Sequence, residues 1–202
     1  MAKSKSLSMK SLRSFRNQIK ESKPFKDEAN KVSLRVFKSI QKDFFDEFDN
    51  HPVTKEIEGG STASNISGTL GGYGNLFSFI GFNSSDMPII QLREALRSMM
   101  RVSRVKTRKG RDTKVYFDIS IPTMKVISSV TPMPWENGRS WVSAVERGIS
   151  GFGYYMSTQE RRFSRSGGGV QVDTRIRPGA YTPIKYMSQM LKDLSRNLRR
   201  LA

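Results

Sequence analysis

The stretch from Ser61 to Ser85 contains no charged residue, although the whole chain has a formal net charge of +17. Its sequence is STASNISGTLGGYGNLFSFIGFNSS, in which glycines are followed by, and mixed with, aromatic residues. A disordered linker would lack the aromatic side chains, and a regular strand would lack the glycines. We therefore expect a loop that bends sharply and then buries its aromatic side chains, either on its own sheet or between subunits.

The length of 202 residues and the hydrophobic content of 36% predict one modest core. Cysteine is absent, which excludes disulfides, a thiolate nucleophile and a cysteine-based metal site. No run of about 18 apolar residues is present, so we expect no membrane partner. The predicted organisation is a basic N-terminal arm over residues 1–26 and a single domain over residues 27–202, with a long glycine and aromatic loop at 58–85.

The positive charge is concentrated in three blocks, residues 1–26, 97–114 and 161–202, which together carry +22 while the rest of the chain carries −5. Such blocks are typical of proteins that contact nucleic acid or acidic neighbouring subunits, and both partners stay open. Phe163 lies among three arginines, a pattern that suits phosphate contact beside one stacking ring. The candidate residues for contact with DNA or another polyanion are Arg104, Lys106, Arg108, Lys109, Arg111, Arg161, Arg162 and Arg165.

Apolar periodicity predicts helices over 27–49, from about 87 to 100, from Pro122 to Val130, over SWVSAVERG and from Thr182-Pro183 to the C-terminus. In the first of these, Val36, Ile40, Phe44 and Phe48 recur every four residues, and Pro52 ends the helix. The last helix carries a short heptad pattern, which favours docking on a neighbouring surface over a coiled coil. Residues 1–26 are expected to be an extended arm that becomes helical against a partner.

Alternating side chains predict a hairpin over 102–121, with its turn at RKGR, and two further strands in ISGFGYYMST and GGVQVDTRIR. These elements indicate an α+β fold, in which a long N-terminal helix, a central helix and a C-terminal helix surround a mostly antiparallel sheet of about four strands.

The chain carries no evident catalytic constellation. GTLGGYGN lacks the Gly-Lys-Ser/Thr ending of a phosphate-binding loop. His51, the only histidine, precedes a proline at a helix end and suits a cap or a structural hydrogen bond. Glu56 and Glu58 lie beside a lysine and are expected to be solvated. We therefore predict no catalytic residue, no metal site, no cofactor and no enzymatic activity.

Several segments in order resemble virion structural proteins of tailed bacteriophages, of the kind at the neck or tail-completion layer between head and tail. A long helix leads to a turn at Pro52 and Val53 and then to a loop with Gly68, Thr69 and Leu70. A third motif and a closing motif follow, at Trp141, Val145, Glu146 and Gly148 and at Pro178, Tyr181, Pro183 and Ile184. The resemblance covers about residues 27–200, but residues 1–26 and the length of the loop from Glu58 to Phe82 depart from the pattern.

The resemblance implies a non-catalytic adaptor that forms a ring around the DNA channel. Its partners would be identical subunits, neighbouring virion proteins on the portal and tail sides, and DNA in non-specific contact. Its location would be the virion, assembled in the bacterial cytoplasm. A baseplate or other virion position, and a non-specific nucleic-acid-binding module, are the alternatives. The candidate assembly residues are Tyr73, Leu76, Phe77, Phe79, Ile80, Phe82, Trp141 and Glu146.

Overall fold

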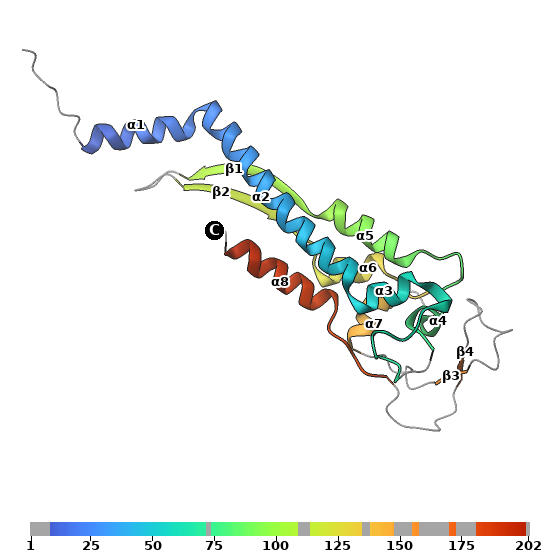
Figure 1. The fold of residues 1–202 in the computed structure, drawn as a ribbon. Coiled ribbons are helices and arrows are strands. Elements are labelled where there is room, and N and C mark those ends of the chain that lie inside the picture. The colour runs from blue at the N-terminus through green and yellow to red at the C-terminus, as the bar shows by residue number, and fades with distance from the viewer. Residues whose placement is uncertain are drawn as a thin grey trace, which may run out of the picture. The chain divides into compact units, whose positions relative to one another are not determined.

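The computed structural model describes residues 9–71, 74–108, 114–134, 138–147, 155–157, 170–172 and 181–200. The chain divides into two compact units. Unit 1 consists of Met1–Gln41 and Met100–Ile121, and unit 2 consists of Lys42–Met99 and Pro122–Ala202. The expected domain boundary after residue 26 falls inside the long helix α2, and this helix continues from unit 1 into unit 2 (Figure 1).

Unit 1 contains helix α1 (Met9–Glu21), the first part of α2 (Lys23–Asn50) and a hairpin of β1 (Arg101–Arg108) and β2 (Lys114–Ser120). Ser22 separates the two helices, and its carbonyl accepts from the Lys26 backbone N–H at 3.1 Å in the first turn of α2. Proline is tolerated in that turn because the first helical N–H groups have no intrahelical partner. Pro24, expected at the end of the arm, therefore lies at the start of a helix.

The strands of the hairpin pair antiparallel, from Arg101 opposite Ser120 to Arg108 opposite Lys114. The register shifts between Val102 and Val105, as at a β-bulge. The predicted hairpin is confirmed, while its expected turn reaches into residues 109–113, outside the described residues.

Unit 2 is built from short helices around the end of α2. They are α3 (Pro52–Glu58), the 3-10 turn Gly60–Thr62, α4 (Leu76–Ile80), α5 (Pro88–Met99), α6 (Met124–Val130), α7 (Trp141–Arg147) and α8 (Met187–Arg199). A short antiparallel pair, β3 (Tyr155–Ser157) and β4 (Val170–Val172), completes the described elements of this unit. Figure 1 shows α8 beside the C-terminal part of α2, where the rings of Phe48 and Tyr186 stack at 6.2 Å.

The core of unit 2 collects apolar side chains from almost every helix. Phe44 and Phe48 of the predicted stripe on α2 are buried, and so is the neighbouring Phe45. In the part of α2 that belongs to unit 1, Val36 of the stripe is exposed, whereas the adjacent Phe37 is buried. The heptad positions Met187, Leu191 and Leu194 of α8 are buried as well, which confirms that this helix docks by its apolar face.

The predicted fold class was wrong. Eight α-helices dominate the described residues, and the strands form two separate two-stranded pairs instead of one sheet of about four strands. Alternation along the chain reports which segments are strands but contains no information about pairing between distant hairpins. The expected extended N-terminal arm contains the helix α1, in keeping with the helical spacing of Leu12, Phe15 and Ile19.

The predicted helix over 27–49 is confirmed, and it starts four residues earlier, at Lys23. The predicted helices at 87–100, 122–130 and 140–148 are confirmed within two residues. The cap predicted at Thr182-Pro183 was wrong, because α8 begins only at Met187. The backbone N–H of Thr182 is instead donated to the carbonyl of Thr69 at 2.8 Å, which holds this segment in a non-helical connection.

Candidate functional site

The apolar part of the uncharged stretch is buried in unit 2. Leu76, Phe77, Phe79, Ile80 and Phe82 are all at most 4% exposed, and they lie on and just after the short helix α4. Tyr73, the remaining candidate of this stretch, is outside the described residues. The five described side chains therefore serve the chain's own core, and their assignment to a subunit interface stays a prediction. Serine at Phe77 and Phe79 would disturb the fold before any assembly step.

Helix α4 has a capping residue at each end that the sequence reasoning did not identify as a cap. The Asn75 side chain accepts from the Ser78 N–H at 2.9 Å and donates to the carbonyls of Ser61 and Ala63 at 2.9 and 3.1 Å. At the other end, Gly81 has φ 88°, a left-handed conformation that favours glycine. An Asn directly before a short apolar run, here Asn75 before Leu76, is the N-cap signal that could have predicted this helix.

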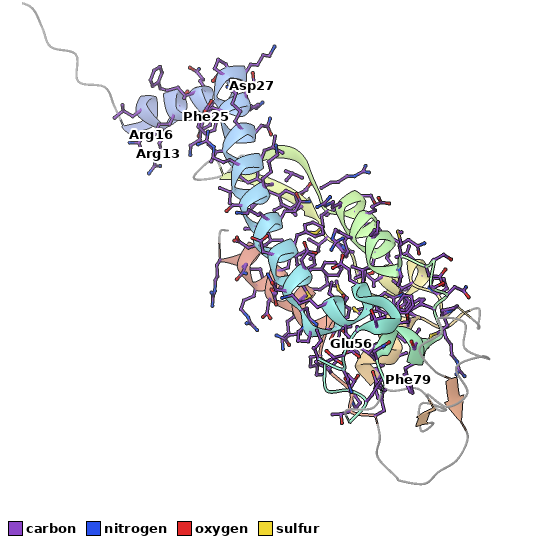
Figure 2. The ribbon with its side chains drawn as sticks, turned by 45° about the vertical axis from the view of Figure 1, so that its right-hand side comes forward. Arg13, Arg16, Phe25, Asp27, Glu56 and Phe79 are labelled. Carbon is purple, nitrogen blue, oxygen red and sulfur yellow. The ribbon has the colours of Figure 1, made fainter. Side chains whose placement is uncertain are left out.

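Glu56 is the central polar group of this region and was expected to be solvated, which was wrong. Its carboxylate is fully buried and accepts the Leu76 N–H at 2.7 Å and the Ser67 N–H at 2.8 Å. It therefore ties α3 to both ends of the glycine-rich loop (Glu56 and Phe79 are labelled in Figure 2). A buried carboxylate is tolerable only when it is hydrogen-bonded. Glu58, two residues on, is exposed as expected.

Aromatic rings link the stretch to the two later motifs. Phe82 meets Trp141 edge to face at 6.0 Å, and Phe79 stacks on Tyr181 at 5.8 Å. Trp141 in turn lies 6.5 Å from Tyr186, whose hydroxyl is 2.8 Å from the Thr54 hydroxyl. Burial raises the pKa of Tyr186, so its phenol stays protonated.

The closing motif is held by α7. The Tyr181 hydroxyl donates to the Val145 carbonyl at 2.8 Å, and the Glu146 carboxylate accepts the Ser188 N–H at 2.6 Å in the first turn of α8. Burial, and then the charge of Glu56, raises the pKa of Tyr181, which keeps it a donor. Glu146 is thus a helix cap supplied from another helix, where a negative charge is favourable.

His51 is a helix cap, as predicted. Its Nδ1 accepts the Val53 N–H at 3.2 Å at the start of α3, and its Nε2 lies 3.2 Å from the Lys185 carbonyl. The two contacts fit one neutral tautomer, with the proton on Nε2. Burial lowers the pKa of His51, against the opposing effects of the Lys185 carbonyl and the Glu146 charge.

A charge cluster around Arg93 joins three helices of unit 2. Its guanidinium contacts Asp49 at 2.7 Å and Glu58 at 3.3 Å, and it lies 5.7 Å from the centre of the Phe48 ring. Sequence reasoning missed this cluster, since its members are 35 and 44 residues apart and no local pattern connects them.

The candidate residues for contact with DNA or another polyanion lie outside the uncharged stretch and the later motifs. Arg104, Lys106 and Arg108 lie on β1 of unit 1, while Lys109, Arg111, Arg161, Arg162 and Arg165 are outside the described residues. By sequence, unit 1 contains 18 Lys and Arg against 5 Asp and Glu, a net charge of +13. Unit 2 contains 17 against 13, a net charge of +4. Three quarters of the excess positive charge is therefore in the unit with α1 and the hairpin.

Within the described ranges, no group of three or more His, Cys, Asp or Glu side chains is arranged to hold a metal ion. None of the described helices combines the length and apolarity that a bilayer-spanning helix needs. Comparison of the chain with protein-family models, with curated proteins and with solved structures gave no significant match.

Proposed function

We propose that this chain is a structural adaptor of a tailed-phage virion, which forms a ring at the neck or tail-completion layer between head and tail and surrounds the DNA channel. Its partners in this proposal are identical subunits, the portal-side and tail-side proteins, and DNA in non-specific contact. The role is structural, with no catalytic step.

The observation that carries the proposal is the way in which the four resembling segments meet in unit 2. Thr69 of the loop motif accepts from Thr182 of the closing motif, and Val145 of the third motif accepts from Tyr181. Val53, of the turn after the long helix, is fully buried in the same unit. Three weak motifs joined by hydrogen bonds, with the fourth buried in the same unit, are better support for a shared fold than four motifs that only follow one another.

The charge distribution supports the DNA contact. A net charge of +13 on unit 1, without a base-reading motif in the sequence, suits contact with phosphates along a channel. The same observation favours the second candidate, a non-specific nucleic-acid-binding module outside a virion. A baseplate position would use the same fold in another layer of the particle.

The deciding experiment is to locate the protein in intact particles produced by the bacterium that carries its gene. A tagged copy would be followed by cryo-electron microscopy of purified particles. We expect density for the protein as a closed ring between portal and tail tube. Density at the baseplate would favour the baseplate alternative, and absence from purified particles together with tight binding to duplex DNA would favour the nucleic-acid-binding module.

A further inference from the structure

Helix α1 presents an apolar stripe that nothing in the described chain covers. Leu12, Phe15 and Ile19 are 40%, 60% and 45% exposed. Their spacing of three and four residues puts them on one face of the helix. Arg13 and Arg16 are also exposed, and their helical positions place them along one flank of that stripe (Figure 2). The stripe with its cationic flank is the first of two complementary surfaces.

The second surface is a cavity of about 260 Å³ in unit 2, between the end of α3 and the start of α5. Its apolar lining includes the buried Ile57, Phe77 and Ile89 and the exposed Met87. Glu58 and Asp86 also line it, so the cavity has two carboxylates against an apolar floor. It is smaller than the sites of about 300–1,000 Å³ that take small-molecule ligands, whereas an anchoring aromatic side chain suits its size and character.

The two surfaces match in charge as well as in apolarity. Each carboxylate already has one contact, Glu58 to Arg93 at 3.3 Å and Asp86 to the Asn83 N–H at 2.7 Å. A carboxylate has about four acceptor positions, so each retains capacity for a guanidinium. Opposite charges beside matched apolar surfaces provide both orientation and affinity.

Every copy of the chain carries both surfaces, so the α1 of one copy can meet the cavity of another copy.

We propose that α1 of one copy docks on the α3–α5 cavity of the next copy, with Phe15 as the anchor and with Arg13 and Arg16 facing Glu58 and Asp86. The contact joins two different surfaces, so a bound pair of copies still offers one unused α1 and one unused cavity, which is the condition for a ring or a filament. This inference rests on the proposed ring and names the contact that would build it.

The test uses the full-length protein, which contains no natural cysteine. Gln18→Cys, on α1 beside the stripe, and Met87→Cys, at the cavity, are prepared as separate variants, mixed at high concentration and treated with a short bis-maleimide. We expect the mixed Gln18–Met87 dimer to be the main product. The matched control replaces Met87→Cys with Val126→Cys, at a side chain that is 41% exposed on α6, and should yield little mixed product.

Sedimentation velocity provides the second readout. Truncation of an anchor side chain, Phe15→Ala, should weaken self-association about 30-fold or more. Leu34→Ala, at another exposed apolar side chain of unit 1, should leave it unchanged. A mixed product no more abundant than the control, or products only between two Gln18→Cys chains, would overturn the inference, whether or not oligomers form. The proposed function fails separately, if the protein is absent from purified particles.

Discussion

Replacement of Glu56 by glutamine tests the account of the glycine-rich stretch directly. In the structure, the two carboxylate oxygens each accept one backbone N–H, from Ser67 and Leu76, and the side chain is fully buried. Glutamine has nearly the same shape but only one acceptor oxygen. One of the two N–H groups would then face the amide NH₂ and lose its partner.

The expected loss follows from the two bonds. A hydrogen bond to a charged group contributes about 1.5–3 kcal/mol, and a buried donor left unsatisfied costs about 1–3 kcal/mol. Removal of a buried charge offsets part of this loss. We therefore expect Glu56→Gln to lower the free energy of unfolding by about 2–4 kcal/mol. In a chain of this size, such a loss lowers the melting temperature by roughly 5–12 °C.

Urea unfolding followed by tryptophan fluorescence is a suitable assay, because Trp141 lies in the same core and contacts Phe82. The matched control is Glu58→Gln, which makes the same chemical change two residues away. The Glu58 side chain is 47% exposed, and such surface ion pairs contribute only about 0–1 kcal/mol. If the two variants unfold at the same urea concentration, Glu56 does not hold the loop in the way described.

Three further outcomes are expected. Since burial lowers the pKa of His51, the unfolded chain binds a proton more readily than the folded one, and the resulting contribution to stability is present above about pH 6.5 and lost as the pH falls further. His51→Asn keeps a capping oxygen and should flatten the dependence of the urea midpoint on pH in this range. An unchanged pH profile would contradict the assignment. Glu146→Gln should lower the free energy of unfolding by about 1–2 kcal/mol, because the cap on α8 becomes weaker. A loss below about 0.5 kcal/mol would show that the cap is unimportant. Simultaneous replacement of Arg104, Lys106 and Arg108 by Gln should lower the salt dependence of duplex DNA binding by the amount expected for the loss of about two to three phosphate contacts. Three lysine-to-glutamine changes in unit 2 should leave the salt dependence nearly unchanged. An equal effect of both sets would place the DNA contact elsewhere.

Most elements could be predicted because their signals are local. The repeat of Val36, Ile40, Phe44 and Phe48 identified α2, and Pro52 predicted its end correctly. The hairpin followed from alternation around a turn sequence. His51 was assigned to a helix end because it directly precedes a proline, and the structure has it there as the cap of α3.

The errors have one physical cause, which is interaction between residues far apart in the chain. Glu56 lies beside a lysine and looks like a surface residue, yet its partners are 11 and 20 residues away. Thr182-Pro183 looks like the start of a helix, but a hydrogen bond to Thr69 holds the segment in another conformation. The separate strand pairs and the Arg93 cluster were missed for the same reason.

By itself, the amino-acid order determined the long helix, the hairpin, the capping histidine and the concentration of positive charge, since each depends on neighbours within a few residues or on composition alone. It also determined that the stretch from Ser61 to Ser85 would bend and bury aromatic side chains, as Phe77, Phe79 and Phe82 do. Only the tertiary structure decided where: α4 is buried in unit 2 because Glu56 and Asn75 satisfy its first N–H groups from outside the helix. A carboxylate on one helix and the donors that it satisfies on a distant loop become neighbours only when the chain has folded.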